Sequence, residues 1–138
     1  MSETDELRRV WDHLVSHQPS RDLDGWVNCF AGDGAMEWPF RINGVPPRAE
    51  GREAIRAALE PIWTRAKEAN RRIHKHDNVV FHRTTDPQVA IVEFDVVGET
   101  PRGSFRQSML YVLRARNGQV LLLRDYVDTG GLSALIAA

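Results

Sequence analysis

The sequence predicts an α+β fold in which a cone-shaped, curved antiparallel sheet wraps around N-terminal helices. Apolar residues recur at helical spacing in the first half of the chain, whereas from about Arg72 they alternate with polar residues, as in strands. Turn-forming residues divide this second half into four segments. A chain of 138 residues has room for one hydrophobic core, so we expect a single domain over residues 1–138.

Three helices are expected in the first half. The apolar stripe of the first consists of Leu7, Val10, Trp11, Leu14 and Val15. A short second helix spans roughly Leu23 to Phe30, with Asp22 as a candidate N-cap. The third opens at Gly51, and Pro61 inside it predicts a kink or a break.

The expected strands begin with a short one over residues 35–40, which follows a turn at AGDGA and precedes a loop over 41–51. Four longer strands, expected to form an antiparallel meander, cover residues 73–83, 89–99, 104–116 and 119–128. Asn117-Gly118 is typical of a two-residue hairpin turn. The apolar tail after Asp128 is expected to cover a pocket or to reach a partner.

Composition excludes several function classes. Eighteen Lys and Arg stand against 19 Asp and Glu, and the arginines are scattered, so we expect no nucleic-acid partner. The single cysteine, Cys29, allows no internal disulfide and reads as a small buried apolar residue. We expect that the acidic start MSETDELRR does not act as a signal peptide, and no apolar run approaches roughly 20 residues. We therefore expect a cytoplasmic protein with no membrane partner.

The segment LLLRDYVD carries the main candidate for chemistry, Asp125. In a regular strand this carboxyl shares its face with Leu121, Leu123 and Val127. A carboxyl on an apolar face is desolvated, which raises its pKa toward the range of a working general acid or base. The alternative is a structural ion pair with Arg106 or Arg114.

Asp128 and Asp95 are further candidate acids. Asp128 falls on the opposite face from Asp125 in a regular strand, so it is either a cap at the strand end or, if the strand is irregular, a second acid. Asp95 shares with Glu93 the face opposite the apolar residues of its strand, and both are expected to face water.

Three histidines, His74, His76 and His82, are expected on one side of an extended strand. A His-x-His pair can bind zinc only with a third ligand, so we expect a polar sheet face, no metal and no cofactor. His76 is kept as a candidate acid/base partner, because histidine titrates near neutral pH.

Five aromatic residues could line a cavity for a flat, apolar ligand, or could simply pack in the core. They are Trp26, Trp38, Phe40, Trp63 and Tyr111.

Three segments together, DLDGWVNCFAGDGAMEWPF, EGREAIRAAL and NGQVLLLRDYVD, resemble the nuclear transport factor two-like superfamily and its SnoaL-like branch. That branch includes polyketide cyclases, ketosteroid isomerases and limonene epoxide hydrolases. The resemblance implies a cystatin-like α+β barrel with an apolar pocket inside the cone and carboxylate chemistry without a cofactor.

The resemblance carries over to individual residues only in part. Trp38 stands where ketosteroid isomerases have their aspartate base. Asp95 and Asp128 match both aspartates of limonene epoxide hydrolases, but Glu93 replaces their arginine, and Glu37 and Pro39 replace their tyrosine and asparagine.

A third branch, the phenazine-biosynthesis A/B-type proteins, resembles DNVVFHRTTDPQVAIVEFDVVG and LLLRDYVDTGGLSALI. The catalytic glutamate of those proteins maps to Asp125, and their histidine partner maps near Asn70.

These likenesses favour an enzyme-like protein that isomerises, cyclises, dehydrates or opens the epoxide of a small hydrophobic metabolite of polyketide or aromatic type. The alternative is a non-catalytic ligand-binding or assembly module of the same fold. We also expect a homodimer through the outer face of the sheet.

Overall fold

The computed structural model describes residues 3–137, in which helices precede most of the sheet. The elements are α1 (Glu3–Val15), α2 (Leu23–Asn28), β1 (Phe30–Glu37), β2 (Arg48–Glu50), α3 (Arg52–Glu68), β3 (Arg72–Arg83), β4 (Val89–Thr100), β5 (Gly103–Arg116), β6 (Gln119–Val127) and α4 (Thr129–Ala137).

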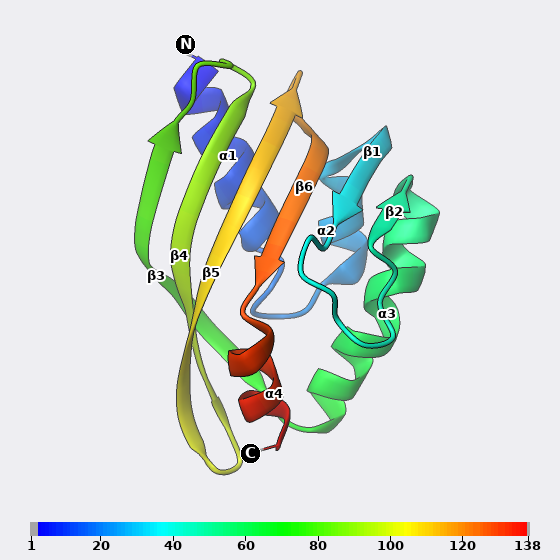
Figure 1. The fold of residues 1–138 in the computed structure, drawn as a ribbon, viewed down its shortest axis with the longest axis vertical. Coiled ribbons are helices and arrows are strands. Elements are labelled where there is room, and N and C mark those ends of the chain that lie inside the picture. The colour runs from blue at the N-terminus through cyan, green and yellow to red at the C-terminus, as the bar shows by residue number, and fades with distance from the viewer. Residues whose placement is uncertain (1–2, 138) are drawn as a thin grey trace.

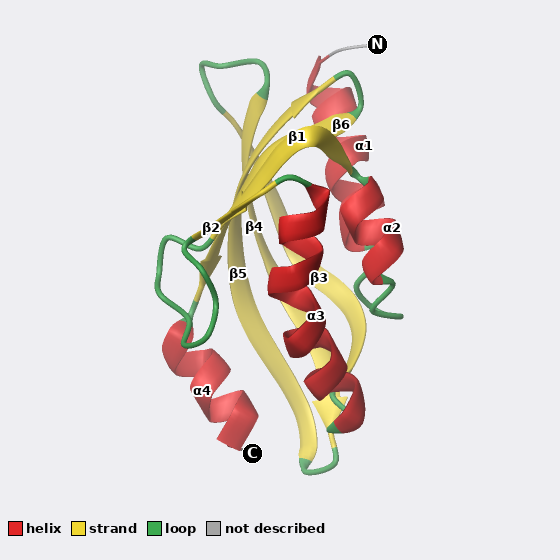
Figure 2. Ribbon diagram, turned by 90° about the vertical axis from the view of Figure 1, so that its right-hand side faces the viewer, coloured by secondary structure: helices red, strands yellow, loops and turns green. Residues whose placement is uncertain are grey.

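One curved sheet holds the strands in the order β2-β1-β6-β5-β4-β3. Strands β3 to β6 form the predicted antiparallel meander, and β1 pairs with β6 in parallel. Figure 1 shows the long strands curling at their lower end, and Figure 2 shows α1, α2 and α3 along one face of the sheet. Helix α4 lies at the end of the molecule opposite the N-terminus (Figure 1). The predicted α+β cone is confirmed.

The core lies between the concave face of the sheet and the helices. The whole predicted stripe of α1 is buried there, because these side chains pack on the alternating apolar residues of the strands. The inward residues of β4, for example, are Ala90, Val92, Phe94 and Val96.

The first strand begins at Phe30, so the prediction of a turn at AGDGA was wrong. The pairing of β1 with β6 is irregular between Phe30 and Ala35, and Gly34 is needed there for close backbone approach. A Cβ at Gly34 would lie 2.7 Å from the carbonyl oxygen of Val120. Strand β2 falls in the segment expected to be a loop.

Of the kink or break predicted at Pro61, the break does not occur, because α3 continues through this residue as one helix. Ile55 and Leu59 before the proline and Ala66 after it are all buried. This packing outweighs the backbone hydrogen bond that a proline cannot donate. The other predicted boundaries hold well: Asp22 caps α2 by accepting from the Gly25 N–H, and α3 follows Gly51.

Strand β3 departs from regular alternation at two places, between Ile73 and Lys75 and between Asp77 and Val80. The prediction that the three histidines share one side was therefore wrong. His76 pairs with the inward-facing Val96, whereas His74 and His82 contact acids on β4 and are about half exposed. A bulge shifts the facing of every residue beyond it.

The end of the chain follows the predictions in part. Asn117 and Gly118 both have positive φ, as the predicted two-residue hairpin turn requires. The apolar tail forms α4. Over the described residues, none of the helices combines the length and apolar character that crossing a membrane requires.

Candidate functional site

Asp125 is buried on β6 with only 7% of its surface exposed. It lies directly opposite Tyr111 of β5, and its neighbours on the same face, Leu123 and Val127, are also buried. Its Oδ1 atom has no hydrogen-bond partner among the residues that the structure describes. The predicted apolar face is therefore correct for Asp125.

The arginines proposed as alternative partners of this carboxyl are engaged elsewhere. Arg106 pairs with acids on the outer face of the sheet, and Arg114 pairs with Asp86 at 3.1 Å. Burial without a cationic partner raises the pKa of Asp125 to about 7. The carboxyl can therefore both accept and release a proton near neutral pH.

A hydrogen-bonded chain of side chains leads from His76 on β3 to Tyr111, the residue that lies opposite Asp125. His76 Nε2 donates to Gln18 Oε1 at 2.6 Å, and Gln18 Nε2 donates to the Tyr111 hydroxyl at 3.1 Å. Burial, followed by the nearby charge of Asp125, raises the pKa of Tyr111 well above 10. Burial lowers the pKa of His76. Tyr111 thus keeps its proton, and His76 is held neutral with its hydrogen on Nε2.

Aromatic rings enclose this chain. Phe94 packs edge-on against Tyr111 and Trp11, with ring centroids 4.8 and 5.4 Å apart. Trp11 also lies edge-on to His76. The indole Nε1 of Trp11 is buried without a partner among the described residues. An unpaired buried donor costs about 1–3 kcal/mol, so the fold tolerates polar atoms here at the expense of stability.

A cavity of about 160 Å³ lies at the lower end of the cone, between the sheet, α3 and α4. Its walls are mainly apolar: Ile62, Trp63, Ala66, Ile73, Val96, Phe105, Met109, Leu132 and Leu135. Gln18, Gln107, Arg21 and Arg71 supply its polar groups.

Asp125 does not line this cavity, but it lies next to it along the inner face of β6. Met109 lines the cavity and pairs with Val127, while the next inward residues along the two strands are Tyr111 and Asp125. Gln18 belongs to both places, because it lines the cavity and donates to Tyr111.

Two cationic groups at the cavity have no carboxylate within ion-pair distance among residues 3–137. They are Arg21 and Arg71. The Arg21 guanidinium donates to the backbone carbonyl of Arg71. Burial, and then the charge of Arg71, lowers the pKa of Arg21. Two positively charged side chains next to each other favour the binding of an anion.

The predicted aromatic residues do not gather in one place. Trp63 lines the cavity, and Trp26 packs edge-on against it with the ring centroids 5.5 Å apart. Tyr111 lies opposite Asp125. Trp38 is buried in the core but does not line the cavity. Phe40 is 56% exposed and packs on Tyr126, away from the cone interior.

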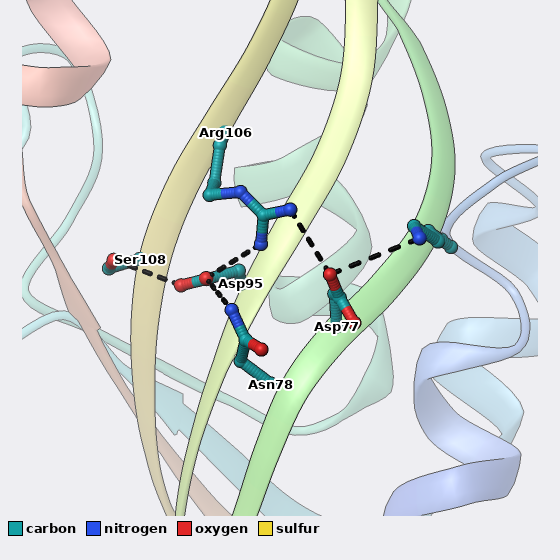
Figure 3. Close-up of polar contacts among 6 residues, drawn as sticks. Asp77, Asn78, Asp95, Arg106 and Ser108 are labelled. Carbon is teal, nitrogen blue, oxygen red and sulfur yellow. Dashed lines mark hydrogen bonds and ion pairs between the residues drawn. The ribbon is translucent and has the colours of Figure 1, made fainter.

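Asp95 lies on the outer face of the sheet, where Figure 3 shows it bound to three partners. Arg106 Nη1 contacts it at 2.9 Å, Asn78 Nδ2 at 2.8 Å and Ser108 Oγ at 2.9 Å. Hydrogen bonds from Asn78 and then Arg106 lower the pKa of Asp95. Asp95 points outward, as regular alternation along β4 predicts. It therefore lies on the opposite side of the sheet from Asp125.

Asp128 is exposed and directly precedes α4, and its Oδ1 accepts from the Gly131 N–H in the first turn of that helix at 3.0 Å. It therefore has the capping position that was considered for it, and it does not join Asp125. Sequence reasoning missed Gln18, Arg21 and Arg71, because turn residues without periodicity carry no signal of where they point.

The family of the chain follows from comparison with known proteins. Residues 7–122, most of the sequence, match the SnoaL-like domain. The chain belongs to the SnoaL-like family. This SnoaL-like chain is also 35% identical over 121 residues to the uncharacterised PhzA/B-like protein of Pseudomonas aeruginosa, covering 86% of the chain and 82% of that protein. The predicted resemblance is confirmed.

Solved structures show the same fold. A candidate isomerase from Bacillus subtilis is 20% identical with a TM-score of 0.80, over 99% of this chain and 96% of that one. A phenazine biosynthesis-related protein from Pseudomonas aeruginosa is 16% identical with a TM-score of 0.71, over 98% and 83%. At these sequence identities the structural similarity shows the fold alone. Any reaction has to be inferred from the residues inside the cone.

Proposed function

We propose that this SnoaL-like protein is a cofactor-independent enzyme that moves a proton on a small apolar metabolite carrying an anionic group, with Asp125 as the general base and acid. The observation that carries the proposal is a buried carboxyl whose Oδ1 has no hydrogen-bond partner within residues 3–137 and whose pKa is raised to about 7. Burying such a group is costly for the fold, and perturbed carboxyls of this kind are concentrated at functional sites.

Tyr111 would supply the complementary acid. Its hydroxyl oxygen accepts from Gln18, so its own hydrogen stays available for a substrate oxygen. As Asp125 removes a proton from a carbon next to a carbonyl group, Tyr111 stabilises the negative charge that develops on the oxygen. Gln18 and His76 act as positioning residues, because they hold the Tyr111 hydroxyl in place.

Isomerisation, cyclisation, dehydration and epoxide opening all require such a base and acid pair. The names of similar proteins, a candidate isomerase and a phenazine biosynthesis-related protein, support this range. The apolar walls favour a substrate with an aromatic or aliphatic body. Arg21 and Arg71, which have no carboxylate partner in the described part of the chain, favour a carboxylate on that substrate. To reach Asp125, the substrate displaces the flexible side chain of Met109.

Proton abstraction can be tested without the natural substrate. The probe is 2-tetralone, an apolar bicyclic ketone, whose α-hydrogens exchange with D2O and are followed by NMR. We expect catalysed exchange that rises with pH and levels off above about 7, as the pKa of Asp125 requires. Asp125→Asn should lower the rate by about 10²-fold or more.

Matched variants separate base catalysis from general damage. Tyr111→Phe should lower exchange roughly 10²-fold, as expected for loss of a donor to the developing oxyanion. Asp95→Asn, on the outer face, should leave exchange unchanged. If Asp125→Asn exchanges the probe as fast as the native protein, Asp125 is not the base.

The anionic part of the proposal has its own test. 2-Naphthoate and its neutral counterpart 2-naphthamide differ only in the charged group. We expect calorimetry to show tighter binding of 2-naphthoate, and Arg21→Gln or Arg71→Gln to remove that preference. Equal affinities for both compounds would exclude the anionic subsite while leaving the base assignment intact.

A non-catalytic ligand-binding module is the second candidate. The observation in its favour is that Asp125 lies beyond the cavity walls, behind Met109. This function predicts 2-naphthoate binding with no catalysed exchange at any pH. It also predicts that Met109→Ala, which widens the path inward, leaves exchange at the buffer rate.

We also propose a homodimer through the outer face of β5 and β6. Half-buried Leu110 pairs with Tyr126 there, and exposed Phe40 packs on the same tyrosine. An apolar strip of this kind is favourable to a second copy of the chain. Sedimentation should show a dimer that Leu110→Arg dissociates, and a monomer at all concentrations would refute it.

A further inference from the structure

A cluster of two histidines and a cysteine lies outside the proposed active site, where the ends of α1 and α2 meet. His13 is in the last turn of α1, His17 follows four residues later, and Cys29 ends α2 as its C-cap. Their ligand atoms all lie within 4.8 Å of one another. None of them takes part in the hydrogen-bonded chain from His76 to Tyr111.

We propose that His13, His17 and Cys29 form a zinc-binding site that joins the two helices. Two imidazoles and one thiolate are a ligand set that zinc accepts, with a water molecule completing a tetrahedron. Tetrahedral zinc places such ligand atoms roughly 3.3–3.8 Å apart, so a separation of 4.8 Å at most has to close by roughly 1 Å, and the exposed His13 side chain has room to move.

A second observation, independent of the cluster, supports a metal at His17. Asp22 Oδ2 lies 3.3 Å from His17 Nδ1, a contact that favours a ring proton on Nδ1 and a free lone pair on Nε2. That Nε2 atom is buried and has no partner among the described residues. A carboxylate that orients a histidine in this way is the usual support of a zinc ligand.

The backbone makes room for this arrangement at Gly25. A Cβ there would lie 2.3 Å from His17 Nδ1 and 2.5 Å from Asp22 Oδ2. The carbonyl of the same residue accepts from the Cys29 thiol at 3.3 Å. One glycine thus seats the ring, the carboxylate and the thiol against each other.

The charge of a bound zinc ion would be balanced by groups at the site. Zinc takes the thiolate of Cys29, whose proton passes to the solvent, because a coordinating thiol is deprotonated. The histidines stay neutral, so the site carries one positive charge, and Asp22 next to it supplies one negative charge. The site would stabilise the junction of α1 and α2 and needs no catalytic role.

Cobalt(II) is the direct probe, because its colour reports its ligands. Added to the metal-free protein, one equivalent should give the thiolate-to-cobalt charge-transfer absorption and the intense visible bands of tetrahedral cobalt, and zinc should abolish both. Cys29→Ser should remove the charge-transfer absorption. His13→Gln changes an exposed side chain and should weaken zinc binding at least 10-fold in calorimetry.

Asp22→Asn tests the support of His17 without removing the cap of α2, because asparagine caps helices as well as aspartate does. We expect about 10- to 100-fold weaker zinc binding with the fold retained. His82→Gln, at an exposed histidine on β3, is the control and should bind zinc as the native protein does. Zinc affinity unchanged in His13→Gln, or cobalt bound without charge-transfer absorption, would overturn the proposal.

Discussion

The buried carboxyl of Asp125 should make the stability of the protein depend on pH in an unusual direction. Its pKa is about 7 in the folded chain and near 3.8 when exposed. As pH rises, the unfolded chain loses this proton first, while the folded chain still holds it. The contribution of Asp125 therefore falls from about pH 4 upward and becomes constant once the pH exceeds about 7.

The size of the effect follows from the same two values. Each pKa unit corresponds to about 1.4 kcal/mol, so the full loss of stability amounts to about 4 kcal/mol. Between pH 5 and pH 8 the expected part is roughly 2.5 kcal/mol. For a chain of this length that is roughly 9 °C in melting temperature.

Asp125→Asn isolates this term, because the amide has a similar shape and does not titrate. Urea unfolding of the native protein and the variant at pH 5 and pH 8 gives the difference in their unfolding free energies. That difference should shift in favour of the variant by roughly 2.5 kcal/mol at the higher pH. If the difference in unfolding free energy is the same at both pH values, the pKa of Asp125 is not raised in the folded protein. The main argument for Asp125 as the base would then be refuted.

Three further predictions concern the surroundings of the site. Gly98→Ala should destabilise by roughly 1–3 kcal/mol or more in urea unfolding, because its Cβ would lie 1.9 Å from the Arg72 carbonyl oxygen. Gly32→Ala, where no atom lies within 4 Å of the added Cβ, is the control, and equal losses would contradict the packing argument. Leu123→Ala, in a fully buried position, should cost about 2–5 kcal/mol, and a loss below 1 kcal/mol would speak against its place in the core. NMR titration should find His76 with a pKa below 6.5 and neutral at pH 7; a midpoint at or above 6.5 would contradict its burial.

The sequence predicted more of the fold than of the candidate site. Alternating strands, the Asn117-Gly118 turn and the stripe of α1 all appear where they were predicted, because each is a local pattern with a local cause. The same holds for Asp125, since simple alternation in β6 places it among apolar residues. Alternation likewise predicted that Asp95 faces outward.

Only the tertiary structure decided which groups meet. Bulges in β3 turn His76 inward and leave His74 outside, and a bulge depends on how a strand pairs with its neighbour. Gln18, Arg21 and Arg71 come from turns, and packing alone brings them to one cavity. Distances along the chain determine helices and strands, whereas a site is made by contacts between residues far apart in sequence, such as Gln18 and Tyr111.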